Sequence, residues 1–304
     1  MHATLDDLVL ALYVTIDDLL RDHPEQLPPR PKVGFSPKIS DAELITLAVM
    51  AALAGYPSER RWLRHAREHL SGMFPYLPAQ PGYNKRLRKL APTMVWLIAR
   101  LGAGCSIADD DVWVVDSTPV ECARSRETVQ RSELAGWAEY GYCASHSRFF
   151  WGLRLHLVCT LHGLPVGWAL TGAKTDEREA LEAILAGLPI VPGGVGHQLL
   201  IADKNYFGRE FEAELAAAGI DLLRPARNGE PPRPGARFFR PLRQIIESIN
   251  QTLKGQLDLE RHGGRTPAGV CTRIAQRLLA LTAAIWHNHH LGATIRRSLI
   301  AYDH

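Results

Sequence analysis

The chain of 304 residues is predicted to be an α/β protein, with a mixed sheet flanked by helices and an all-helical module before it. Apolar residues recur at helical spacing through the first hundred residues, and from residue 111 short apolar runs alternate with amphipathic stretches. The order strand, hairpin, helix, strand, helix, strand, helix predicts a mixed sheet with helices on its faces. We expect residues 1–105 to form the helical module and residues 106–304 the second domain.

The helical module is expected to contain several short helices. Apolar side chains over residues 5–16 lie at helical spacing, and a proline-rich stretch over residues 23–38 interrupts them. Ser40 begins a second helix, with Glu43 in the capping-box position and an apolar run that ends at Gly55. Two further helical stretches follow, over residues 57–70 and 84–101.

The charge of this module is unevenly distributed. The chain as a whole carries only +3, but residues 57–100 hold nine basic and two acidic side chains, a local charge of +7. Residues 240–304 hold nine basic and four acidic side chains, or +5. Segregated positive charge favours a polyanion such as nucleic acid, because neutralised phosphates release counterions. Residues 1–105 are therefore interpreted as a helix-turn-helix-like DNA-binding region, with a helical dimerisation bundle as the alternative.

The second domain is expected to contain a strand over residues 111–120 and a hairpin over residues 149–172 with Gly163 in its turn. A long helix over residues 241–257 follows a breaker rich in Pro and Gly, and a last amphipathic helix over residues 272–292 is expected to cover an edge of the sheet. Between the hairpin and the long helix, helices and strands alternate over residues 175–188, 197–207, 208–219 and 220–227.

Three carboxylates mark a candidate site in this domain. Asp116 and Asp203 both follow apolar runs, and they converge if the two strands are parallel neighbours. Glu247 lies in a helix long enough to cross the sheet. Three gathered carboxylates repel one another unless cations neutralise them, and Mg²⁺ prefers such oxygen ligands. Each aspartate taken alone is also explained as the cap of a turn.

The sequence around each acid carries a motif. Asp116 begins an Asp-Ser-x-Pro sequence, and Asp203 begins an Asp-x-x-Tyr sequence with Asn205 where many similar proteins have Gly. Arg243, Glu247 and Lys254 are spaced four and seven residues apart, so we expect them to project from one side of a helix. With these motifs, residues 116–254 resemble the catalytic domain of bacterial insertion-sequence DDE transposases. Arg240 departs from that pattern, which has Tyr at this position.

The resemblance implies an RNase H-like fold and a transposase that cleaves DNA at terminal inverted repeats and transfers the strand to target DNA. It implies that Asp116, Asp203 and Glu247 are the catalytic residues and hold two Mg²⁺ or Mn²⁺ ions. A metal-activated water would cut the DNA, and the freed 3′-hydroxyl would then attack the target without a covalent enzyme intermediate. Arg243 and Lys254 would bind phosphates, and Tyr206 would stack on or hydrogen-bond the DNA.

The implied partners are double-stranded DNA, as terminal inverted repeats and as target, and further copies of the chain in a homodimer or larger synaptic complex. An RNase H-like nuclease or resolvase without strand transfer shares the acidic triad and is one alternative. A catalytically silent DNA-binding regulator derived from a transposase is another.

Other titratable residues are weaker candidates. His287, His289 and His290 lack the partners of a zinc site and are interpreted as a helix-end cluster. His156 is expected on the solvated face of the hairpin. Asp176 is expected to cap its helix rather than to act as a fourth acid near the metal.

Composition limits the compartment. The five cysteines form no C-x-x-C pair and are expected to be reduced. The first residues are acidic where a signal peptide is basic, and no run of 18 apolar residues occurs. We therefore expect no membrane partner and a bacterial cytoplasmic, nucleoid-associated protein.

Overall fold

The structure is a computed structural model that describes residues 4–30, 36–143, 147–188, 198–235 and 239–302. It divides into two compact units, one formed by residues 1–104 together with 252–304 and the other by residues 105–251. The first division agrees with the boundary expected near residue 105. The second differs from the expectation, because the C-terminal segment belongs to the helical unit and not to the unit with the sheet.

Six helices build the helical unit in the described part of the chain, and their sequences contain the signals that begin them. Thr4 and Ser40 each form a capping box, with Asp7 and Glu43 respectively, so both helices start at the expected residue. These helices are α1 (Leu5–Asp22), α2 (Asp41–Leu53), α3 (Glu59–His69), α4 (Gln80–Lys89), α5 (Ala91–Ala103) and α10 (Pro267–His290).

Helix α10 is the central element of this unit. It packs against α5, α2 and α1, and its residues from Ile274 to Asn288 are all buried. A helix that is buried on every side needs neighbours all around it, and α5, α2 and α1 of the same unit supply them. By length and composition α10 is also apolar enough to cross a membrane, but most of that stretch is buried inside the protein.

The turns between the basic helices are unlike those of a helix-turn-helix. Residues 70–79 separate α3 from α4, whereas a helix-turn-helix uses a turn of roughly 3–4 residues. Leu90 alone separates α4 from α5. The basic stretch over residues 84–101, which was expected to be helical, is therefore two helices that meet at Leu90.

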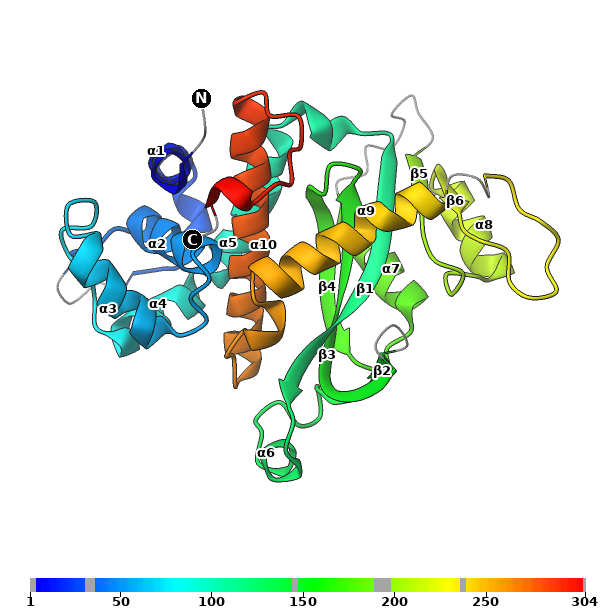
Figure 1. The fold of residues 1–304 in the computed structure, drawn as a ribbon, viewed down its shortest axis with the longest axis horizontal. Helices are drawn as coiled ribbons and strands as arrows, with labels where there is room; N and C mark the ends of the chain where they lie inside the picture. The colour runs from blue at the N-terminus through cyan, green and yellow to red at the C-terminus, as the bar shows by residue number, and fades with distance from the viewer. Residues whose placement is uncertain (1–3, 31–35, 144–146, 189–197, 236–238, 303–304) are drawn as a thin grey trace. The chain divides into compact units, whose positions relative to one another are not determined.

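The second unit contains a mixed sheet with the strand order β2-β3-β1-β5-β6, and β4 pairs with β3 (Figure 1). Strands β1 and β3 are antiparallel, and β1 and β5 are parallel neighbours, so the condition under which the two aspartates converge is met. The strands are β1 (Val112–Ala123), β2 (Glu139–Cys143), β3 (Arg148–Thr160), β4 (Pro165–Gly172), β5 (Gln198–Ile201) and β6 (Ile220–Leu223).

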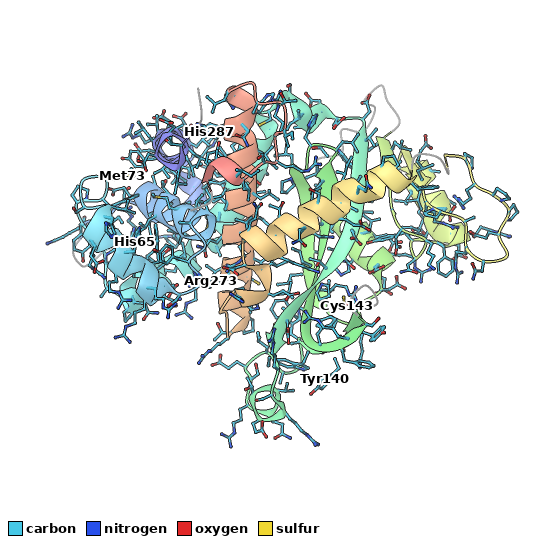
Figure 2. All side chains as sticks on the ribbon, viewed as in Figure 1. His65, Met73, Tyr140, Cys143, Arg273 and His287 are labelled. Carbon is cyan, nitrogen blue, oxygen red and sulfur yellow. The ribbon has the colours of Figure 1, made fainter. Side chains whose placement is uncertain are left out.

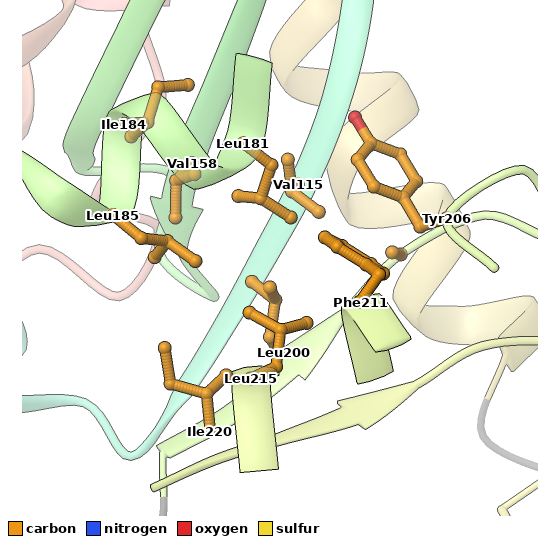
Figure 3. Packing of buried hydrophobic residues seen from close by; sticks show 11 residues of the cluster. Val115, Val158, Leu181, Ile184, Leu185, Leu200, Tyr206, Phe211, Leu215 and Ile220 are labelled. Atoms are coloured by element: carbon orange, nitrogen blue, oxygen red, sulfur yellow. The ribbon is translucent and has the colours of Figure 1, made fainter. Parts of the chain in front are cut away.

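Helices flank this sheet as the α/β pattern predicts. They are α7 (Glu177–Ala186), α8 (Arg209–Ala217) and α9 (Phe239–Gln251), whereas the short α6 (Arg126–Gln130) lies beyond the end of β1 (Figure 1). Helices α7 and α8 pack on β4 and β6, and α9 lies across β1 (Figure 1). The core between α7, α8 and the sheet is apolar, with Leu181, Leu200 and Phe211 among its buried residues (Figure 3).

Three details of this unit differ from the expectation. Strand β1 does not end near residue 120 but continues to Ala123, and β2 and α6 were not expected. The long helix ends at Gln251 and continues as a π-helical turn over Thr252–Gln256. A short 3₁₀ turn lies at Ser106–Asp109 in this unit, and others lie at Pro24–Gln26, Leu259–Arg261 and Ile300–Tyr302 in the helical unit.

Candidate active site

The two aspartates lie where the parallel pairing of β1 and β5 ends. That pairing covers Val112–Val114 and Leu199–Ile201, so Asp116 and Asp203 each follow the last paired residue by two positions. Burial raises the pKa of Asp116, and the negative charge of Asp203 acts in the same direction. Asp116 is expected at the end of its strand, but it lies in the interior of β1.

Asp116 sits in a confined and polar setting. Burial is the main cause that raises the pKa of its carboxyl to about 7, and the charges of Asp203 and Glu177 raise it further. Two hydrogen bonds act in the opposite direction: the Ser117 amide donates to Oδ1 at 2.8 Å, and Asn250 Nδ2 donates to Oδ2 at 2.8 Å. The raised pKa means that the charged form of Asp116 lacks full compensation from the protein.

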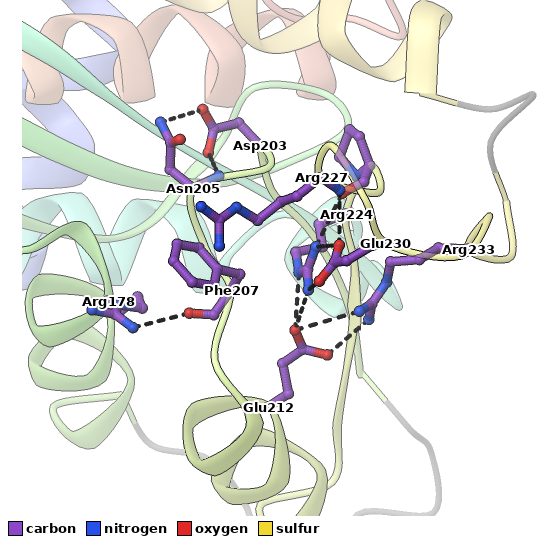
Figure 4. A network of polar contacts seen from close by, with 10 residues as sticks. Arg178, Asp203, Asn205, Phe207, Glu212, Arg224, Arg227, Glu230 and Arg233 are labelled. Atoms are coloured by element: carbon purple, nitrogen blue, oxygen red, sulfur yellow. Dashed lines mark hydrogen bonds and ion pairs between the residues drawn. The ribbon is translucent and has the colours of Figure 1, made fainter.

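Asp203 is exposed and is oriented by the residues that follow it. The Asn205 amide donates to Asp203 Oδ1 at 2.7 Å, and Asn205 Nδ2 donates to Oδ2 at 3.1 Å (Figure 4). An aspartate that accepts from the amide two residues later forms an Asx turn, which limits the rotation of the carboxylate. The asparagine in the Asp-x-x-Tyr motif therefore holds Asp203 through its side chain as well as through its backbone.

Glu177 joins this region, and the sequence analysis did not single it out. Ser117 Oγ donates to Glu177 Oε1 at 2.5 Å, and Arg154 Nη1 donates to Ser117 Oγ at 2.9 Å and to Glu177 Oε1 at 3.3 Å. Burial raises the pKa of Glu177, and the charge of Asp203 adds to that shift. The only local signal was its place in the first turn of a capped helix, which many acidic residues share.

Tyr206 is buried beside the acids. Its side chain is 1 % exposed and packs in the apolar core beside Phe211. The expectation that its ring stacks on DNA does not agree with this burial. Its hydroxyl points away from Phe211 (Figure 3), and among the residues that the structure describes it has no hydrogen-bond partner. Burial raises the pKa of Tyr206 well above its usual value, and the charges of Glu177, Asp116 and Asp203 act in the same direction.

The third predicted acid lies on α9. Glu247 is exposed and precedes Asn250 by three residues, so the two residues lie on the same side of a helix whose Asn250 reaches Asp116. The side chain of Arg243 lies outside the described part of the chain. Lys254 lies in the π-helical turn after α9 and in the other compact unit, so the expectation of one α-helical face for these three residues does not hold.

The carboxylate groups of these acids are suitable ligands for a divalent cation. Mg²⁺ is bound by one or two carboxylates, several waters and substrate phosphates, and Asp116 and Asp203 supply such a pair. The uncompensated burial of Asp116 and the unpartnered hydroxyl of Tyr206 are the features that a hydrated cation would satisfy. In the part of the chain that the structure describes, no three His, Cys, Asp or Glu side chains already stand together as a complete cation site.

The weaker candidates have structural positions. His156 is expected on the solvated face of the hairpin, but it is fully buried. Its Nε2 lies 2.9 Å from Thr171 Oγ1, and burial lowers its pKa to about 4. Asp176 caps α7 by accepting from the Arg178 amide at 2.9 Å, as predicted. On α10, His287 is buried with its Nδ1 2.8 Å from Tyr302 Oη (Figure 2).

Two other expectations concern the histidine cluster and the cysteines. His290 Nδ1 lies 2.8 Å from the Trp286 carbonyl of its own helix, so it engages the helix end. Among the residues that the structure describes, the five cysteines form no disulfide.

The chain matches one known protein family over a range that includes this unit. A family model described as a transposase DDE domain matches residues 107–283, which is more than half of the chain. A search of curated proteins found no match. The matched range includes Asp116, Asp203 and Glu247, and a mixed α/β unit with helices around its sheet is consistent with an RNase H-like fold.

Proposed function

The chain belongs to the transposase DDE-domain family, and we propose that it cuts DNA at the terminal inverted repeats of its own element and joins the freed ends to target DNA. The family makes it a transposase, an enzyme of the DNA-cutting class. The proposal adds the substrate ends, the joining step, and Asp116, Asp203 and Glu247 as the catalytic residues.

The observation that carries this proposal is the position of Asp116 and Asp203, each two residues beyond the last paired residue of the parallel strands β1 and β5. Helix α9 contributes Asn250 to the same carboxylate and carries Glu247 one turn earlier. Acids from two strand positions and one crossing helix suit phosphoryl transfer, in which positioning and charge neutralisation do most of the catalysis.

Asp116 and Asp203, with Glu247, would hold two Mg²⁺ or Mn²⁺ ions. When bound, such ions supply an activated water or 3′-hydroxyl and neutralise charge on the phosphate. Asn205 keeps the Asp203 carboxylate oriented, and Asn250 and the Ser117 amide do the same for Asp116. These hydrogen bonds preorganise the acids before DNA arrives.

DNA binding is proposed to use the basic helices of the other unit. Exposed cations lie on α3 and α4, and exposed arginines suit phosphate contacts that fix the register of the DNA. A homodimer or a larger synaptic complex would bring the two ends of an element together. The exposed cations on these helices are Arg60, Arg61, Arg64, Arg67, Lys85, Arg88 and Lys89.

Purified full-length protein would be incubated with Mg²⁺, supercoiled plasmid and an end-labelled duplex carrying the DNA that flanks the reading frame. Wild type should cut the duplex at the repeat and yield plasmid-joined product. Asp116→Asn should retain DNA binding but lose cutting and joining, whereas Asp111→Asn, an exposed residue just before β1, should behave as wild type.

The same experiment separates the alternatives. Cutting without joined product would replace the transposase proposal with a nuclease or resolvase. Binding to the flanking DNA without cutting, unchanged by Asp116→Asn, would indicate a regulator.

A further inference from the structure

One residue links Glu177 to the predicted catalytic acid on β1. The Ser117 amide donates to Asp116 Oδ1 at 2.8 Å, and the Ser117 hydroxyl donates to Glu177 Oε1 at 2.5 Å. Ser117 therefore contacts both carboxylates, one through its amide and one through its hydroxyl. Glu177 is also mostly enclosed, with 21 % of its side chain exposed.

The charge of this group is unbalanced. Asp116, Asp203 and Glu177 act on one another electrostatically, and Arg154 is the cation that hydrogen-bonds within the group. Counted over these four side chains alone, three carboxylates and one guanidinium leave two negative charges, which is the charge that one divalent cation would neutralise. Of the other arginines nearby, Arg178 pairs with Asp176 at 2.5 Å, and Arg227 lies over the Phe207 ring.

The hydroxyl of Tyr206 provides independent evidence for a ligand at this position. It is buried without a hydrogen-bond partner, and the acids that act on it are Glu177, Asp116 and Asp203. A buried hydroxyl without a partner costs roughly 1–3 kcal/mol, so proteins seldom keep one unless a water or ligand satisfies it. A cation that carries its own waters would supply that partner.

We propose that Glu177 is a fourth acid of the divalent-cation site, and that it and the Tyr206 hydroxyl hydrogen-bond the waters around a cation held by Asp116 and Asp203. This inference rests on the proposed function. Contact through water agrees with the reluctance of Mg²⁺ to shed its hydration shell.

The test is direct measurement of Mn²⁺ binding to the full-length, metal-free protein, by the electron paramagnetic resonance signal of free Mn²⁺. Groups that orient a metal's ligands or waters typically change affinity about 10–100-fold when removed, so Glu177→Gln should weaken binding about tenfold. Glu179→Gln, an exposed residue two positions along α7, should leave affinity unchanged. Asp203→Asn should abolish binding at the same concentrations.

A structural role for Glu177 predicts a different result. If Glu177 only braces α7 against β1 and β3, Glu177→Gln would lower the melting temperature without Mn²⁺ and leave Mn²⁺ affinity within twofold of wild type, and the inference would be overturned. Our proposal expects the reverse: little change without metal and a smaller rise in melting temperature when Mn²⁺ is added.

Tyr206→Phe checks the site without touching a carboxylate. Loss of the hydroxyl should weaken Mn²⁺ binding about threefold, since a typical hydrogen bond contributes about 0.5–1.5 kcal/mol. Unchanged affinity in both Tyr206→Phe and Glu177→Gln, with binding lost in Asp203→Asn, would defeat this inference and leave the proposed function standing. Unchanged affinity in Asp203→Asn would count against the proposed function itself.

Discussion

Asn250 on α9 donates a hydrogen bond of 2.8 Å from its Nδ2 to Oδ2 of Asp116 in the interior of β1. This contact attaches the helix that carries Glu247 to the strand that carries the first predicted catalytic acid. It also lowers the pKa of Asp116, against the larger effect of burial. The side chain that orients the helix therefore also favours the charged form of the acid.

Replacing Asn250 by Ala should shift the pH dependence of DNA cutting. Without this donor the pKa of Asp116 rises above about 7, so the acidic limb of the cleavage rate should move to higher pH. Cleavage rates measured from pH 5.5 to 9 would show the shift. Asn228→Ala, at an exposed turn, is the matched control, and an identical pH profile for both variants would contradict the assigned contact.

Asp116→Asn should stabilise the metal-free protein at neutral and higher pH. The folded pKa of Asp116 is raised, so the stability of wild type is greatest below the unfolded value near 4 and falls as pH rises toward about 7. Each tenfold change in proton affinity corresponds to about 1.4 kcal/mol. Melting temperatures at pH 5 and pH 8 should show a larger gain for Asp116→Asn at pH 8, and an equal gain at both would contradict the shift.

His156 should make stability depend on pH in the opposite direction to Asp116, over a similar range of pH. Burial lowers its folded pKa to about 4, so stability is fully present above the unfolded value near 6.5 and falls as pH drops toward 4. His156→Gln, which keeps a polar group near Thr171, should remove part of this acid sensitivity. Denaturant unfolding at pH 5 and pH 7.5 would show it as a smaller difference between the two pH values than in wild type.

Gly152 should be essential for the sheet. A Cβ at this position of β3 would collide with the Val120 carbonyl and the Cys122 amide of β1, both of which are backbone atoms. Gly152→Ala should therefore destabilise the protein by more than about 2 kcal/mol, or prevent folding. Gly187→Ala, where an added Cβ meets ordinary contacts only, is the control. Equal melting temperatures for the two variants would contradict this packing.

Much of the helical and strand pattern was predictable from local sequence. The capping box at Ser40, the hairpin around Gly163 and the apolar runs before Asp116 and Asp203 identified their elements because spacing and turn residues act locally. The parallel pairing of β1 with β5 also agreed with the α/β order. The location of both aspartates just beyond the paired residues of β1 and β5 followed from that pairing.

What sequence could not predict depends on long-range packing. Glu177 and Asn250 approach Asp116 from residues 61 and 134 positions away, and neither lies in a distinctive pattern. The burial of the Tyr206 ring and the position of α10 among helices depend on which neighbours cover them. The spacing of Arg243, Glu247 and Lys254 predicts one α-helical face, but a π-helical turn contains Lys254 and interrupts that face.

The most direct measurement of the central claim is DNA cutting by Asp203→Cys with Mg²⁺ and then with Mn²⁺. Asp203 is exposed, so a cysteine there can be accommodated, and a thiolate binds Mn²⁺ better than the harder Mg²⁺. If Asp203 holds the catalytic cation, the variant should be inactive with Mg²⁺ and recover cutting with Mn²⁺. Full cutting by Asp203→Cys with Mg²⁺ would contradict the account.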